Sequence, residues 1–120
     1  MRAEIVAART GPHTSYLLHI FKLTILTNGG GPGVMAVDEL IQSSGKLAQL
    51  SDETREALNK VIPHSDTAAN PVDIFGDSAP VRYKHALEIL LNAKEVKNLL
   101  IIHTPSALAP SENYAQVIVE

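Results

Sequence analysis

A short apolar run that ends in a cluster of glycines constrains the fold of this chain more than any other feature. Residues 22–27 read Lys-Leu-Thr-Ile-Leu-Thr and are followed by Asn28, three consecutive glycines, Pro32 and Gly33. The length of the run, its β-branched residues and its glycine boundary favour a buried strand. The residues from Pro32 have helical periodicity, and proline fits a first helical turn because its missing N–H is not needed there. This segment is therefore predicted to be a strand, a glycine loop and a helix.

The remainder of the chain continues the alternation of strands and helices. Further strands are predicted at 46–50, 70–75 and 96–103. Further helices are predicted after Ser51, which acts as an N-cap, and from Pro80 to Ala93. Buried faces are predicted for the first helix at Val34, Val37, Leu40 and Ile41, and for the helix from Pro80 at Val81, Ala86, Leu87, Leu90 and Leu91. Alternating elements of this kind predict a parallel sheet of about four strands with helices on both faces.

The domain organisation predicted from these elements is simple. Residues 1–21 form a divergent N-terminal segment, and residues 22–120 form one domain that is incomplete at its C-terminal end. A last helix, capped by Ser111, has no following strand to return to. The truncated sheet is expected to leave an edge with unpaired backbone groups, which predicts a homo-oligomer formed through that edge.

Composition excludes several classes of function. The chain has no cysteine, which removes disulfides, thiolate catalysis and cysteine-based zinc sites. The net charge of −3 and the absence of a run of Lys and Arg argue against a nucleic-acid partner. No apolar stretch is long enough to cross a bilayer and no secretory signal is recognisable, so we expect a cytoplasmic protein without a membrane partner.

The glycine loop is the one segment with evident chemical capacity. Glycines at the carboxyl end of a strand allow positive φ angles and close approach of another group. The helix that follows directs unpaired N–H groups and its dipole at the same point, which is how many α/β proteins hold phosphate. The loop lacks the lysine and hydroxyl of a P-loop and the glycine spacing of a dinucleotide fingerprint. Two interpretations therefore stay open: a phosphate site, or a tight turn that only lets the helix pack.

A second group of polar residues surrounds the segment Asn70-Pro-Val-Asp73 and the turn at Gly76-Asp77-Ser78. Asp77 or Ser78 is interpreted as a helix N-cap, and Arg82 as an ion-pair partner of Asp77. Asn70 and Asp73 are the candidates for contact with a ligand or a neighbouring domain. His103, at the end of the last strand, is interpreted as a partly buried histidine bonded to backbone. No metal site is expected, because no histidine has a companion at metal-ligand spacing.

These segments together resemble a known family. Residues 27–40, Thr-Asn-Gly-Gly-Gly-Pro-Gly-Val-Met-Ala-Val-Asp-Glu-Leu, then 50–54, 70–77 and Arg82-Tyr83 look like the third domain of the non-nucleotide-binding part of ADP-forming acetyl-CoA synthetases. The same order occurs in bacterial lysine acetyltransferases that carry a synthetase-like region. The resemblance implies a flavodoxin-like, three-layer α/β/α ligase domain, which is related more distantly to succinyl-CoA synthetase.

The resemblance also implies a role. In such enzymes an acyl-CoA and phosphate give an acyl phosphate, which phosphorylates a histidine, and the phosphoryl group then passes to ADP. The helix after the glycine loop is expected to direct its N-terminus at the phosphohistidine of another domain. The implied phosphate-binding residues are Asn28, Gly29, Gly30, Gly31, Gly33 and Val34. No catalytic residue is assigned, and no cofactor is expected to bind this chain alone.

The parent enzyme implied by the resemblance needs ATP or ADP, CoA and Mg²⁺, together with CoA-binding, phosphohistidine and ATP-grasp domains. None of these domains is recognisable in the chain, so the isolated chain is expected to be inactive. The alternative left open is a non-catalytic interaction or regulatory module, or a remnant of an acetyltransferase fusion. A free-standing flavin or nucleotide binder is disfavoured, because the chain has no Trp and only 4% aromatic residues.

Overall fold

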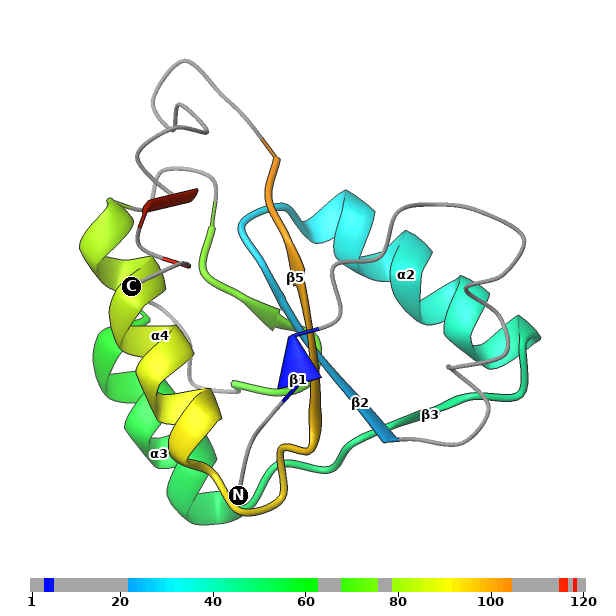
Figure 1. The fold of residues 1–120 in the computed structure, drawn as a ribbon, viewed down its shortest axis with the longest axis horizontal. Helices are drawn as coiled ribbons and strands as arrows, with labels where there is room; N and C mark the ends of the chain where they lie inside the picture. The colour runs from blue at the N-terminus through cyan, green and yellow to red at the C-terminus, as the bar shows by residue number, and fades with distance from the viewer. Residues whose placement is uncertain are drawn as a thin grey trace.

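The fold is an open, parallel α/β sheet (Figure 1). The computed structural model describes residues 4–5, 22–62, 68–75, 79–104, 115–116 and 118. In chain order the elements are β1 (Glu4–Ile5), β2 (Lys22–Thr27), α2 (Gly30–Gln42), β3 (Lys46–Leu47), α3 (Asp52–Val61), β4 (Val72–Asp73), α4 (Pro80–Asn92) and β5 (Asn98–Ile102). The spatial order of the strands is β1-β5-β2-β3, with β4 also paired to β2. The four strands predicted from the sequence are all present and all parallel.

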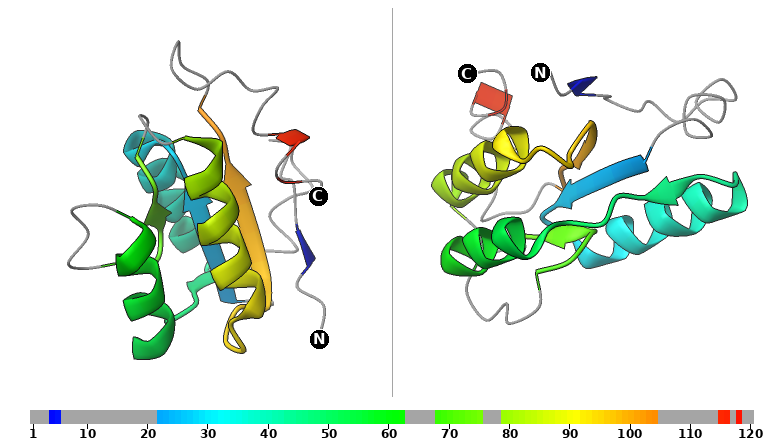
Figure 2. Two further views of the ribbon diagram at one scale, coloured as in Figure 1. Left: turned by 90° about the vertical axis from the view of Figure 1, so that its left-hand side faces the viewer. Right: turned by 90° about the horizontal axis from the view of Figure 1, so that it is seen from below.

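The helices divide between the two faces of the sheet, so that the fold has three layers (Figures 1 and 2). Side chains of β2 alternate between the faces, as expected for a strand covered on both sides. Leu23 and Ile25 pack in the cluster under α2, whereas Leu26 belongs to the larger cluster under α3 and α4. Coverage of both faces explains why the segment from 22 to 27 is buried at every position except Lys22.

Two short strands share one side of β2. β3 pairs with the first two residues of β2, at Lys22 and Leu23, and β4 pairs with the last two, at Leu26 and Thr27. The predicted strands at 46–50 and 70–75 are therefore much shorter as hydrogen-bonded elements than their sequences suggested. Neither can extend further along β2 without meeting the other.

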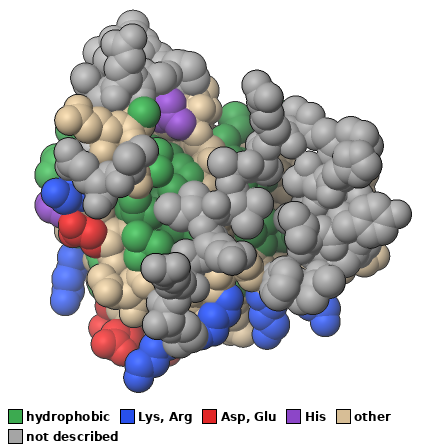
Figure 3. Space-filling model, in the orientation of Figure 1, with side chains coloured by type: hydrophobic (Ala, Val, Ile, Leu, Met, Phe, Trp, Pro, Cys, Tyr) green, Lys and Arg blue, Asp and Glu red, His purple; other side chains and the backbone are tan. Residues whose placement is uncertain are grey.

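An additional strand, β1, lies on the outer side of β5. Glu4 pairs with Asn98 and Ile5 with Leu99, both in parallel register. Sequence analysis did not predict this strand, and it expected the edge beside the last strand to be open. The structure corrects that expectation in part, because β1 pairs with the start of β5 and leaves Leu100–Ile102 without a described strand on their outer side, opposite β2. In the space-filling view, hydrophobic side chains reach the surface in this region, near α4 and β5 (Figure 3).

The helix faces were predicted only in part. In α2, Leu40 is buried and Val37 half-buried, but Val34 and Ile41 are exposed and Gly33 is buried in their place. In α4, Ala86, Leu87 and Leu90 are buried as predicted, whereas Val81 and Leu91 are exposed. Each of these helices is therefore buried along a narrower stripe of residues than the sequence predicted.

The helix ends follow the predicted chemistry in most respects. Ser51 caps α3 by accepting a hydrogen bond from Thr54 N, which confirms its predicted role. α2 begins at Gly30, two residues before the predicted start, so that Pro32 lies in its first turn. The last predicted helix is described only at residues 115–116 and 118, which are helical. Among the described residues, no helix has the length and apolar character needed to cross a membrane.

Candidate functional site

The carboxyl end of β2 brings the predicted glycine loop to the edge of the sheet. Thr27 Oγ1 bonds both polar groups of Gly29: it accepts from Gly29 N and donates to Gly29 O, each at 3.0 Å. Thr27 is buried, so this turn has a fixed starting point in the core. Gly29 is the N-cap of α2 and has an extended backbone. The turn therefore passes directly from strand to helix without a side-chain cap.

The first turn of α2 leaves two backbone donors open. A helix start has four N–H groups without an intrahelical acceptor. Gly29 N is bonded to Thr27, and Pro32 has no N–H. Gly33 N already bonds Gly29 O at 3.2 Å, which begins the helical pattern. No described residue accepts a hydrogen bond from Gly30 or Gly31, and both residues are exposed. The unsatisfied donors of the predicted phosphate site are thus these two groups.

Glycine is needed in this loop because neighbouring side chains come close to it. Its backbone angles are ordinary. Sequence analysis invoked positive φ, but none of the described glycines has one. A Cβ atom at Gly29 would lie 2.7 Å from Thr104 Oγ1, and one at Gly33 would lie 3.1 Å from Thr27 Cγ2. A Cβ atom at Gly31, in contrast, would have no neighbour within 4 Å. Gly29 and Gly33 are needed for packing, while Gly31 faces open space.

Asn28 holds the loop to the end of β5. Its Nδ2 donates to Thr104 O at 2.9 Å and its Oδ1 accepts from Thr104 N at 2.6 Å. The side chain is almost fully buried, so both polar atoms are satisfied in a low-dielectric position. This pair of bonds spans 76 residues of sequence, and no local pattern predicted it. The predicted role of Asn28 at a phosphate remains a prediction.

Asp73 brings a carboxylate to the same edge. β4 ends at Asp73, which is paired with Thr27 across the sheet. One oxygen, Oδ1, accepts from Phe75 N at 2.8 Å, and the other, Oδ2, lies 3.3 Å from the position of a Cβ atom on Gly30. The carboxylate therefore lies beside the positive end of α2.

Phe75 has an unusual conformation next to this carboxylate. Its φ angle is 69°, in the left-handed region that bulky residues rarely adopt, and 41% of its surface is exposed. Strained backbone of this kind gathers at functional sites. Sequence analysis did not identify Phe75.

Asn70 fills the gap between β3 and β4. Its Oδ1 accepts from Ile25 N at 2.9 Å, and its Nδ2 donates to Leu23 O at 2.7 Å and to Ala48 O at 3.0 Å. The carboxamide thus joins the backbone of β2, at Leu23 and Ile25, to the residue that follows β3, Ala48. These bonds give Asn70 a structural role, and its predicted contact with a ligand or a neighbouring domain remains a prediction.

The other predicted polar residues lie around the same edge. Tyr83, which is fully buried on α4, donates from its hydroxyl to Ile102 O at 3.2 Å, and its ring centroid is 6.2 Å from that of His103. Arg82 Nη1 donates to Ile74 O at 3.1 Å. Its predicted partner Asp77 lies outside the described residues, as does Ser78, and α4 has Ala79 at its N-cap without a side-chain hydrogen bond.

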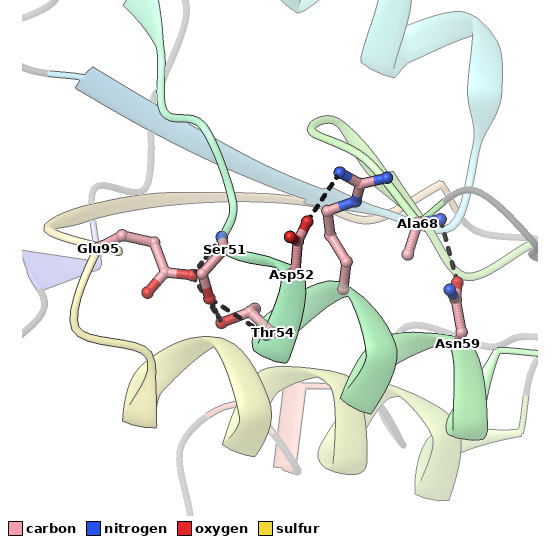
Figure 4. Close-up of polar contacts among 7 residues, drawn as sticks. Ser51, Asp52, Thr54, Asn59, Ala68 and Glu95 are labelled. Carbon is pink, nitrogen blue, oxygen red and sulfur yellow. Dashed lines mark hydrogen bonds and ion pairs between the residues drawn. The ribbon is translucent and has the colours of Figure 1, made fainter.

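α3 offers an informative contrast, because a serine cap and a glutamate side chain meet at its N-terminus (Figure 4). Besides the Ser51 cap, Glu95 Oε1 accepts from Thr54 Oγ1 at 2.6 Å and from Ser51 N at 2.9 Å. Partial burial of Glu95 acts to raise its pKa, but the hydrogen bonds from Thr54 and Ser51 outweigh it and lower the pKa to about 2. The carboxylate of Glu95 is thus hydrogen-bonded at the start of α3, whereas the carboxylate beside α2, that of Asp73, accepts no hydrogen bond from Gly30 or Gly31 among the described contacts.

Among the described residues, the glycine loop lies at the edge of the sheet and outside the one cavity described. A cavity of about 390 Å³ is lined by Leu47, Ala48, Gln49, Leu50, Arg55, Ala69 and Asn70, along β3 and the approach to β4. It does not include the glycines. Among the described residues, no three potential ligands from His, Asp or Glu side chains gather to hold a metal ion. A ligand at Gly30 and Gly31 would therefore need a second surface to enclose it.

The sheet and this edge define the class of the protein: a parallel α/β domain with an open helix N-terminus at the carboxyl end of its central strand. The family follows from sequence comparison. The sequence model of the Ligase-CoA domain matches residues 23–120, and the chain belongs to this family.

Curated relatives are ADP-forming ligases. The chain is 44% identical over 85 residues to acetate–CoA ligase [ADP-forming] I of Archaeoglobus fulgidus, covering 71% of this chain and 12% of the relative. It is 33% identical over 98 residues to 4-hydroxybutyrate–CoA ligase [ADP-forming] of Nitrosopumilus maritimus, covering 82% of this chain and 14% of the relative. The chain thus spans only a small part of the length of these relatives.

Solved structures confirm the fold. The crystal structure of PH0766 from Pyrococcus horikoshii matches with a TM-score of 0.73 and 33% identity, over 82% of this chain and 23% of that one. An acetyl-coenzyme A synthetase 1 of Ca. Korarchaeum cryptofilum, in complex with phosphate and ADP, matches with a TM-score of 0.69 and 24% identity, over 82% of this chain and 22% of that one.

Proposed function

We propose that this chain is a domain of an ADP-forming acyl-CoA synthetase, in which the N-terminus of α2 stabilises a phosphoryl group that another domain carries on a histidine. The observation that carries the proposal is the pair of exposed N–H groups at Gly30 and Gly31, which have no acceptor among the described residues. The first turn of α2 contains no acidic residue, so the dipole remains available to an anion.

The chemistry assigned to this chain is electrostatic. The parent reaction converts acyl-CoA, ADP and phosphate into carboxylate, ATP and CoA, with the phosphoryl group passing through the histidine. Gly30 and Gly31 donate to phosphoryl oxygens and form no covalent bond to them. CoA, the nucleotide and Mg²⁺ are assigned to the CoA-binding, phosphohistidine and ATP-grasp domains, in a cytoplasmic enzyme. The isolated chain supplies one half of an enclosed site and is inactive alone.

The carboxylate of Asp73 should determine how tightly the isolated chain binds phosphate at the glycine loop. Its carboxylate beside Gly30 repels a free phosphate dianion, while the helix dipole attracts it. Two charges separated by about 5 Å interact by roughly 1 kcal/mol in a water-like dielectric. Free phosphate is therefore expected to bind weakly until a partner domain brings opposite charge to the edge.

A phosphate titration followed by amide NMR tests the proposal. The amide signals of Gly30 and Gly31 should shift at millimolar phosphate, and Asp73→Asn should tighten binding about fivefold, which corresponds to roughly 1 kcal/mol. Asp52→Asn, which changes an exposed acid on α3, is the matched control and should leave binding within twofold. Shifts confined to residues remote from the loop, with the two glycine signals unmoved, would reject the assignment.

A second candidate is a non-catalytic interaction module, or a remnant of an acetyltransferase fusion. Its support is the set of exposed apolar side chains at or near this edge of the sheet: Val34, Met35, Phe75 and Val81, with exposed fractions of 59%, 71%, 41% and 55%. The two candidate functions can be distinguished by adding purified CoA-binding, phosphohistidine and ATP-grasp domains in trans. Restored acyl-phosphate-dependent ATP formation supports the synthetase function, whereas stable docking without phosphate shifts at the glycines supports the module.

A further inference from the structure

The hydroxyl of Thr104 lies against the start of α2, in space that a side chain of the helix cap would otherwise take. Thr104 is the second residue after β5 and is exposed. Its Oγ1 is 2.7 Å from the position that a Cβ atom would have on Gly29, the N-cap residue of α2. A side chain at the N-cap commonly supplies the oxygen that binds the first N–H groups of a helix. Glycine at position 29 leaves this space to the hydroxyl of Thr104.

Thr104 is held in place through its backbone. The side chain of Asn28, which is only 2% exposed, donates to Thr104 O at 2.9 Å and accepts from Thr104 N at 2.6 Å. Neither bond uses Oγ1, and no described residue is hydrogen-bonded to that hydroxyl. A buried carboxamide therefore fixes the position of an exposed threonine and leaves its hydroxyl available. Groups that contact a ligand are commonly held in this way by a second layer of residues.

The hydroxyl adds a third donor to the two open backbone groups at this edge. The N–H groups of Gly30 and Gly31 have no described acceptor, and Thr104 Oγ1 lies beside Gly29, the residue before them. Two groups that donate to one anion oxygen can be up to about 6 Å apart, twice a hydrogen-bond length of about 3 Å. The carboxylate of Asp73, beside Gly30, is an acceptor when ionised and cannot take this role.

We propose that Thr104 is a further phosphate-binding residue, whose hydroxyl donates to an oxygen of the phosphoryl group held at Gly30 and Gly31. The inference rests on the proposed function and adds a side-chain contact to a site otherwise made of backbone groups. The contact comes from the end of β5, so the anion is bound by two elements and not by α2 alone. A hydroxyl adds no charge, so its contribution is that of one hydrogen bond in an exposed site.

Titration of the full chain with inorganic phosphate, followed by amide NMR, tests the proposal. Thr104→Val removes the hydroxyl and keeps the shape of the side chain. It should weaken phosphate binding about three- to tenfold, or roughly 0.7–1.4 kcal/mol. Thr104→Ser restores the hydroxyl and should bind phosphate within twofold of the parent. The control Ser43→Ala removes a hydroxyl at the other end of α2 and should also stay within twofold.

The side-chain amide signals of Asn28 show whether the valine variant keeps its structure at this edge. Unchanged signals together with weaker binding assign the loss to the hydroxyl, and Thr104→Ala gives the same comparison if valine disturbs them. Parent-like binding by the valine variant, or a loss that serine does not restore, would overturn the role of Thr104 and leave the site at Gly30 and Gly31 intact. A parent chain whose Gly30 and Gly31 signals do not respond to phosphate would instead reject the proposed function, and this inference with it.

Discussion

At the scale of single residues, the glycine loop contains positions with opposite requirements. Gly29 is closed in by Thr104, whose backbone is held by Asn28, so a methyl group there has no free direction. Gly31 lies two residues further along and has open space around it. The two glycines look equivalent in the sequence, but their packing differs: Gly29 has no space for a side chain and Gly31 has.

Replacing these glycines by alanine should change stability in opposite directions. Gly29→Ala should lower the free energy of unfolding by about 1–2 kcal/mol, because the new Cβ overpacks against Thr104. Gly31→Ala should be neutral or raise it by up to about 1 kcal/mol, because alanine is the better helix former. Urea denaturation of the two variants gives both values. A larger loss for Gly31→Ala than for Gly29→Ala would contradict the packing described here.

An interaction at the site could be predicted when its partners are close in the sequence, and could not when they are far apart in it. The strand, the glycine loop and the helix were predictable because the signals are consecutive in sequence. The bonds of Asn28 to Thr104 and of Asn70 to Leu23 and Ile25 were not, because they join residues 45 to 76 positions apart. Of the two properties that glycine allows, positive φ and close approach, the described glycines use only close approach, at Gly29 and Gly33.

At the scale of elements, the ends of the helices differ in how they are satisfied. α3 has a serine cap, two acidic residues in its first turn and the carboxylate of Glu95. α2 and α4, which both follow strands at the carboxyl edge, have no side-chain cap and no acidic residue in the first turn. The start of α3 is therefore capped by a side chain, and the starts of α2 and α4 are not.

Glu95 predicts a pH dependence of stability. Its pKa in the folded protein is about 2, below the ordinary value of 4.5. A lowered folded-state pKa stabilises the fold above about pH 4.5, and that contribution is lost as the pH falls toward 2. Glu95→Gln should therefore lower the free energy of unfolding by about 1–2 kcal/mol at pH 7, in line with hydrogen bonds to a charged group.

Thermal unfolding between pH 7 and pH 2.5 measures this contribution. The gap between the parent and Glu95→Gln should narrow as the pH is lowered. Glu88→Gln, which changes an exposed glutamate of α4, should show no gap at any pH. A gap that is constant over the whole range would mean that Glu95 acts through packing and not through its charge.

At the scale of the whole molecule, the position of β1 modifies the expected edge of the sheet. The overall architecture was predictable from the alternation of apolar periods, but β1 was not, because a two-residue strand carries no periodic signal. Its pairing covers the outer side of Asn98 and Leu99, and no described strand lies on that side of the rest of β5. Self-association through this edge remains a prediction, and β1 is the element that limits it.

Deleting residues 1–6 should strengthen self-association by about tenfold, or roughly 1.4 kcal/mol, because a longer row of backbone groups becomes available to a second copy. Sedimentation velocity over a concentration series measures the change. Glu4→Gln and Ile5→Val keep the backbone pairing and should behave as the parent does. A truncated chain that remains as monomeric as the parent would show that this edge is not the route of association.

The side chain of Asn28 has a consequence for how a ligand would be received. Both of its polar atoms are bonded to the backbone of Thr104. The segments that follow β2 and β5 are therefore held together. The backbone that leads to Gly30 is thereby ordered in advance, so an arriving anion does not have to organise it and loses little conformational entropy in doing so. Recognition at this edge would then be governed by the encounter with the second surface and not by rearrangement of the loop.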